Sequence, residues 1–145
     1  MGIRFLKIAA VYLAIGASMG LAMGITQSFA LHPVHAHINL LGWATMALAG
    51  LIYLQFPDAA TTRLAKMHFW MHNIAMPVMM IALAFVLTGH ETALYFLEPS
   101  STMMVVSIFL FVVNVCVNVR GSTAGQPAAG RDTMGRSVAA GASAR

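Results

Sequence analysis

Charged side chains are scarce in this sequence of 145 residues. Asp, Glu, Lys and Arg together make up 8% of the chain, whereas 59% of it is hydrophobic. A soluble domain of this size would carry roughly 25% charged residues. The composition therefore predicts a membrane protein. The length suffices for a small bundle and excludes a second domain of any size.

Cysteine is almost absent as well. Cys116 is the only one, so an internal disulfide is excluded, and no Cys-x-x-Cys-His motif is present for covalent attachment of a c-type haem. The net charge of +4 does not predict nucleic-acid binding, because the basic residues do not form a patch.

Long apolar runs are what the chain does have. A helix needs about 20 mostly apolar residues to cross the hydrocarbon of a bilayer. Four stretches qualify, at about residues 5–28, 33–56, 67–89 and 101–119. We expect an all-α integral membrane four-helix bundle over residues 1–120. Residues 121–145 are rich in Gly, Ala and Ser, which predicts a mobile tail that cannot bury a core.

The basic residues all lie on one side of these predicted spans. They precede the first span, separate the second from the third, or follow the fourth: Arg4, Lys7, Arg63, Lys66, Arg120, Arg131, Arg136 and Arg145. Positively charged loops stay on the cytoplasmic side. We therefore expect a multi-pass protein of a bacterial-type inner membrane, with the N and C termini and the tail in the cytoplasm.

Three histidines stand at the outer start of the second predicted span, in the run His32-Pro33-Val34-His35-Ala36-His37. Imidazoles are costly to place in lipid unless they have a partner or a function. The pattern indicates a metal ion or a haem iron near this end. Two alternatives stay open: His32 and His35 are interfacial polar residues, or they form an outward-facing copper or zinc site with His37.

Small residues recur along one face of the first predicted span, at Gly16, Gly20 and Gly24. Such a stripe lets another helix backbone or a flat cofactor approach closely. Helix packing is one interpretation, and a haem ring lying over the groove is the other.

Depth in the membrane limits which residue can share an iron with His37. If the turn between the second and third spans centres near residue 61, His37 lies about 20 Å above the level of His72, at ~1.5 Å per residue. Axial ligands stand only about 4 Å apart, given metal–nitrogen bonds near 2 Å. His72 is therefore a weak candidate. His90, Met103 or Met104 lies at the right depth, as does His37 of a second copy.

The third span contains two histidines one turn apart, His68 and His72. We expect His68, near Arg63 and Lys66, to be an interfacial residue. His72 lies one turn deeper, where it needs a hydrogen-bond partner or a metal.

Two runs of residues resemble a known family. His37-Ile38-Asn39-Leu40-Leu41-Gly42-Trp43, followed by Leu54-Gln55-Phe56-Pro57, resembles the second helix of subunit I of haem–copper oxidases and nitric oxide reductases. Arg63-Leu64-Ala65-Lys66-Met67-His68-Phe69-Trp70 resembles the entry to the third helix of that subunit. The similarity spans about residues 5–119, which implies a relative of its first four helices.

The resemblance carries one functional residue over to this chain. His37 matches the histidine that binds the low-spin haem, which implies an axial haem ligand. The family has twelve helices and takes its second low-spin ligand from the tenth, which this chain lacks. The helices that supply the copper-binding histidines and the high-spin haem ligand are also missing. No Asp, Glu, Lys or Arg lies in the middle of a predicted span. Neither oxygen reduction nor proton pumping is therefore expected from this chain alone.

These observations together predict a b-type haem protein for electron transfer or for redox or gas sensing. His37 would bind the haem at the outer leaflet. A homodimer with a two-fold axis along the membrane normal would place two copies of His37 at equal depth around one haem. A respiratory-chain protein is the expected electron donor. The alternatives are an outer-face copper- or zinc-binding protein, or an assembly factor or structural subunit of a respiratory complex.

Overall fold

A computed structural model describes residues 1–119 of the chain, and the tail predicted for residues 121–145 lies outside them. The described chain is helical from end to end, with short connections. Its elements are α1 (Gly2–Thr26), α2 (His32–His37), the π-helix η1 (Ile38–Thr45), α3 (Met46–Gln55), α4 (Pro57–Thr61), α5 (Arg63–Leu87), the 3-10 helix η2 (Glu91–Ala93) and α6 (Leu94–Asn118).

Four of these helical stretches are long and apolar enough to cross a membrane, namely Gly2–Thr26, His32–Gln55, Arg63–Leu87 and Glu91–Asn118. The predicted all-α membrane bundle is confirmed, and the chain is a multi-pass protein suited to a lipid bilayer. The fourth span begins earlier than residue 101, because α6 continues through Pro99. Pro99 lies in the second turn of α6, where it removes one backbone hydrogen bond, and the helix continues past it.

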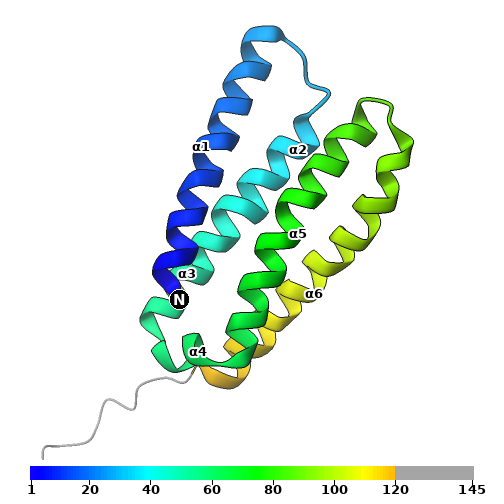
Figure 1. The fold of residues 1–145 in the computed structure, drawn as a ribbon. Coiled ribbons are helices and arrows are strands. Elements are labelled where there is room, and N and C mark those ends of the chain that lie inside the picture. Colours follow the sequence, from blue (N-terminus) through cyan, green and yellow to red (C-terminus); the bar gives the residue numbers. More distant parts are fainter. Residues whose placement is uncertain (120–145) are drawn as a thin grey trace, which may run out of the picture.

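The helices run up and down beside one another (Figure 1). The N-terminus, α4 and the last turns of α6 lie at one end of the bundle, and the connections 27–31 and 88–93 lie at the other. Helix α1 packs along η1 and α3, and α5 packs along α6. We call the end that holds α4 the α4 end.

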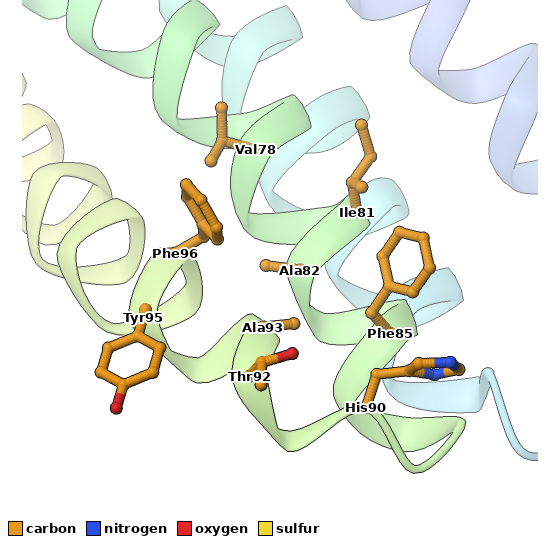
Figure 2. Close-up of a pocket in the computed structure, with 9 residues that line it drawn as sticks. All are labelled: Val78, Ile81, Ala82, Phe85, His90, Thr92, Ala93, Tyr95 and Phe96. Atoms are coloured by element: carbon orange, nitrogen blue, oxygen red, sulfur yellow. The ribbon is translucent and has the colours of Figure 1, made fainter.

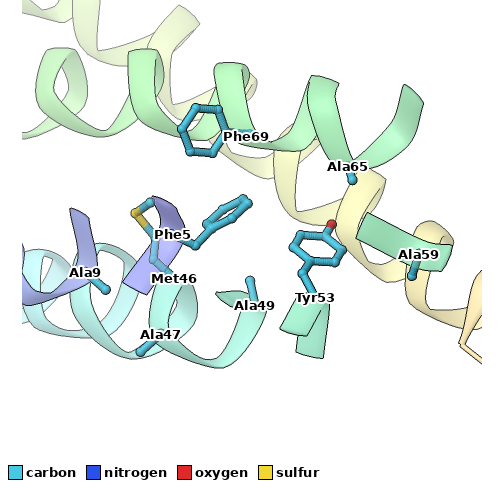
Figure 3. Packing of buried hydrophobic residues seen from close by; sticks show 9 residues of the cluster. All are labelled: Phe5, Ala9, Met46, Ala47, Ala49, Tyr53, Ala59, Ala65 and Phe69. Atoms are coloured by element: carbon cyan, nitrogen blue, oxygen red, sulfur yellow. The ribbon is translucent and has the colours of Figure 1, made fainter. Parts of the chain in front are cut away.

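Two clusters of buried side chains fill the bundle. The cluster at the α4 end is aromatic, with the rings of Phe5, Tyr53 and Phe69 turned towards one another (Figure 3). Alanines surround these rings and let the backbones approach. The second cluster lies towards the other end and consists mostly of methionines and aliphatic residues: Val34, Ile38, Ala75, Met76, Met79, Met80 and Met104.

The second span changes from α-helix to π-helix directly after His37 and returns to α-helix at Met46. Within this stretch Gly42 packs against α1 so closely that an added Cβ would stand 2.7 Å from Cγ of Tyr12. The Thr45 hydroxyl donates to the Leu40 carbonyl, five residues earlier, at 2.8 Å. Such π-helical segments are rare, and they occur frequently at functional sites.

Candidate functional site

His37 lies on the outside of the bundle. Its side chain is exposed, and its Nδ1 stands 2.7 Å from the carbonyl oxygen of Pro33, one turn earlier. A carbonyl can only accept, so Nδ1 carries the hydrogen and Nε2 keeps its lone pair. A shallow apolar groove of about 240 Å³ runs beside the ring, lined by Ala36, His37, Leu40 and Leu41. The ring is therefore held in one tautomer with a free nitrogen at the surface.

The other two outer histidines face elsewhere. His32 is exposed, whereas His35 turns towards α1, where its Nδ1 contacts the Gly16 carbonyl at 3.0 Å. The two rings stand 6.5 Å apart between centroids. Within residues 1–119 no three His, Cys, Asp or Glu side chains are grouped so that they could hold a metal ion. The structure therefore does not bring His32, His35 and His37 together around one metal position.

The small-residue stripe on α1 serves mainly as a helix-packing surface. An added Cβ at Gly16 would stand 2.6 Å from the amide of Asn39, and one at Gly20 would stand 2.8 Å from Cε1 of His35. At these two positions the groove holds side chains of the second span and leaves no room for a porphyrin. Gly24 differs, because an added Cβ there meets no atom within 4 Å.

Three of the candidates for a second haem ligand, His90, Met104 and His72, have different surroundings. His90 is exposed at the end of the bundle opposite α4, beside a larger groove between α5 and the start of α6. Figure 2 shows the His90 ring next to Phe85, with 5.6 Å between their centroids. Met104 and His72 are both buried in the bundle. In one chain, neither of these buried side chains meets the outward-facing ring of His37.

The groove beside His90 has a volume of about 710 Å³ and apolar walls. Val78, Ile81 and Phe96 lie on its two sides, and Thr92 lies near His90 (Figure 2). The groove faces the outside of the bundle, where lipid chains lie against a membrane protein. Nothing else in the described chain covers it.

The predicted depth of His72 relative to His37 is wrong. Nε2 of His72 contacts the Leu41 carbonyl at 3.1 Å, and Leu41 is only four residues from His37. His72 thus lies about one helical turn from the level of His37, or roughly 6 Å at 1.5 Å per residue. A π-helix places more residues in each turn, so η1 shortens the second span slightly and accounts for a small part of this difference. Orientation, and not depth, keeps the two rings apart.

The expectation that His68 is interfacial is also wrong. His68 is 1% exposed and His72 is fully buried, at positions four residues apart on α5. The ring of His68 lies between two phenylalanines, with centroid distances of 5.1 Å to Phe5 and 5.0 Å to Phe111. The spacing of these two histidines marks one helix face in the sequence, but it does not say that this face points inwards.

A chain of buried polar groups extends from His68 towards the α4 end. Nδ1 of His68 contacts the Tyr53 hydroxyl at 3.2 Å. Asn114, fully buried on α6, donates from Nδ2 to the Ala59 carbonyl at 2.9 Å and to the Tyr53 hydroxyl at 3.3 Å. The Thr62 hydroxyl donates to Oδ1 of Asn114 at 2.9 Å. This network joins α3, α4, α5 and α6. Its main signal in the sequence is a pair of asparagines, Asn114 and Asn118, inside an apolar run.

Comparisons of this chain with protein-family models, with curated proteins and with solved structures found no match.

Proposed function

We propose that this protein is a membrane-bound b-type haem protein for electron transfer or for redox or gas sensing, with His37 as an axial ligand. The contact between Nδ1 of His37 and the Pro33 carbonyl, at 2.7 Å, carries this proposal. Histidines that bind metals usually donate their other ring N–H to a carbonyl or carboxylate, which fixes the tautomer and orients the ring. His37 has this arrangement, and its Nε2 is left as the donor atom.

The surface around His37 suits one face of a porphyrin. Ala36, Leu40 and Leu41 are small or aliphatic and border the shallow groove beside the imidazole. When bound, the haem would supply one-electron chemistry, and the protein would supply axial ligation and a low dielectric. The groove covers only part of a porphyrin, so another surface has to cover the rest.

A second copy of this chain is the covering surface that we favour. Two copies related by a two-fold axis along the membrane normal present His37 at the same depth, and isologous dimers of this kind are common. His37 of each copy would then occupy one axial position of a shared haem. His90, which is exposed, is the alternative second ligand, and Met104 and His72 rank below it because both are buried in the core.

The basic residues support a cytoplasmic position for the α4 end. Arg4 and Lys7 lie on the first turns of α1, and Arg63 and Lys66 lie on the first turns of α5. The starts of both helices lie at the α4 end of the bundle (Figure 1). By the positive-inside rule this end faces the cytoplasm of an inner membrane, and His37 lies towards the outer leaflet. A respiratory-chain donor would approach from that side.

The test compares His37→Ala with His32→Ala, a matched loss of an exposed histidine at the same end of the bundle. Both variants should insert and keep the helical circular dichroism spectrum of the natural protein. His37→Ala should emerge without haem, whereas His32→Ala should keep the haem spectrum. An unchanged haem spectrum in His37→Ala would remove this assignment. Copper or zinc in a colourless protein, lost in both variants, would favour the metal-binding alternative.

A further inference from the structure

The two buried histidines of α5 lie side by side away from His37. His68 and His72 stand one turn apart, with 5.5 Å between ring centroids and 87° between ring planes. Ionisable side chains inside a membrane bundle are expensive, and they mark functional sites by default. Their hydrogen bonds show which ring nitrogens are already used.

One ring nitrogen of His72 makes a hydrogen bond to the backbone, and the other has only a distant polar neighbour. Nε2 must donate its hydrogen to the Leu41 carbonyl at 3.1 Å, so Nδ1 carries the lone pair. The nearest polar neighbour of Nδ1 is the Ser107 hydroxyl at 3.4 Å. That hydroxyl makes its better hydrogen bond, at 2.8 Å, to the Met104 carbonyl. The lone pair of Nδ1 is therefore almost free to bind a metal. Nε2, the other ring nitrogen of His72, has the kind of backbone partner that orients a metal ligand.

His68 also has one ring nitrogen in contact with a polar group and one without. Nδ1 contacts the Tyr53 hydroxyl at 3.2 Å. The Tyr53 hydroxyl can donate to Nδ1 or accept from it, and a metal on Nε2 requires the tautomer in which Nδ1 carries the hydrogen and donates to this hydroxyl. Nε2 is buried and has no hydrogen-bond partner among the described residues. Buried polar atoms almost always have a partner, so an unpartnered one calls for an explanation such as a bound ion.

A thioether lies close to the free nitrogen of His72. Sδ of Met104 stands 3.8 Å from the Ser107 hydroxyl, the same group that contacts Nδ1 of His72. Met104 is buried on α6, which faces α5. The Ser107 hydroxyl thus contacts both an imidazole nitrogen and a sulfur atom, and both would be available if this hydroxyl turned away.

We propose that Nε2 of His68, Nδ1 of His72 and Sδ of Met104 bind one Cu(I) ion between α5 and α6. Two imidazoles that share a metal at about 2 Å have ring centres about 5 to 6 Å apart, which matches the separation of these two rings. The site involves neither His37 nor the groove beside it. It is therefore independent of a haem that is shared by His37 of two copies.

The charge of the ion follows from the donor set. All three donors are neutral, and none of the residues in contact with them, Tyr53, Leu41 and Ser107, carries a charge. Burying an uncompensated double charge costs far more than burying a single one. Thioether sulfur also prefers soft ions. Both arguments favour Cu(I) over Zn²⁺.

The experiment titrates detergent-purified full-length protein with Cu(I), under reducing and oxygen-free conditions, against a coloured Cu(I) chelator. We expect one Cu(I) per chain, with nitrogen and sulfur ligands in the X-ray absorption spectrum, and at least tenfold weaker binding of Zn²⁺, an order-of-magnitude estimate from ligand softness. A protein that leaves all Cu(I) with the chelator would overturn the proposal.

Two substitutions that preserve volume test the ligands. Met104→Leu should weaken Cu(I) binding by about tenfold or more and remove sulfur from the spectrum, because Leu replaces Met with little change in packing. Met103→Leu, at the half-buried neighbour, is the control and should bind as the natural protein does. Equal affinity in Met104→Leu and Met103→Leu would contradict the assigned sulfur ligand.

His68→Phe tests the nitrogen ligand without opening a cavity, since Phe can fill the space between Phe5 and Phe111. We expect it to fold and to lose the Cu(I) site. If the circular dichroism spectrum is unchanged and Cu(I) still binds as tightly, His68 is not a ligand and the proposal fails.

Discussion

Nε2 of His72 donates to the carbonyl of Leu41, which joins the middle of α5 to the π-helical turn that follows His37. This hydrogen bond gives the imidazole N–H of His72 an acceptor, and the Leu41 carbonyl a donor, inside the bundle. It also places His72 within one turn of the level of His37, while its ring faces the core.

Loss of this contact should affect stability more than haem binding. In His72→Ala the Leu41 carbonyl loses its side-chain partner and a cavity forms, so we expect the free energy of unfolding to fall by about 1–3 kcal/mol. Haem should remain bound, because His72 does not face His37. Thermal unfolding and the absorption spectrum check the two effects. A folded His72→Ala protein with no haem would show that His72 is itself an axial ligand.

The glycines of α1 predict a graded response to an added methyl group. Gly16→Ala and Gly20→Ala introduce a Cβ at 2.6 Å and 2.8 Å from the side chains of Asn39 and His35, whereas Gly24→Ala meets open space. We expect the first two to lower the free energy of unfolding by about 1–3 kcal/mol, as overpacking does. Gly24→Ala should leave it unchanged or raise it slightly. Equal effects at all three positions in a thermal unfolding series would argue against this packing.

Asn114 should be the most sensitive polar residue near the α4 end. Asn114→Leu removes one hydrogen bond each from the Ala59 carbonyl, the Thr62 hydroxyl and the Tyr53 hydroxyl. Each lost hydrogen bond contributes about 0.5–1.5 kcal/mol, so the loss of three should make the variant unfold at a clearly lower temperature. Asn73→Leu is the control, since Asn73 donates only to the Phe69 carbonyl of its own helix. A small effect of Asn114→Leu would mean that water replaces these hydrogen bonds.

The shared-haem arrangement predicts the ratio of haem to protein. If His37 of two copies occupies both axial positions, purified dimer should contain one haem per two chains. Quantitative haem extraction combined with mass measurement of the detergent complex gives this ratio. One haem per chain in a monomer would place the second ligand within the chain, where His90→Ala and Met104→Leu would then identify it.

The four spans and their up-and-down order could be predicted from the sequence, because length and apolar composition alone decide whether a helix can cross a bilayer. The start of α6 could not be predicted in this way. Glu98 and Pro99 are typical of a loop, but both lie inside this helix. The close approach at Gly16 was predictable as helix packing. Its actual neighbour, Asn39, depends on how α1 and the second span are rotated.

The buried side of α5 was harder to predict. His68 and His72 share a face, but Arg63 and Lys66 nearby suggested a position at the membrane surface. Burial follows from aromatic neighbours that lie far away in the sequence, Phe5 and Phe111. The π-helix has no simple sequence signal either, and it shifted the level of His37 slightly towards His72.

The absorption spectrum of the purified protein, oxidised and then reduced, tests the central proposal most directly. Protein expressed with ample haem precursor should show the Soret band of bound haem and, on reduction, the sharp alpha band of a six-coordinate b-type haem. A well-folded protein that emerges colourless under these conditions would contradict haem binding by His37.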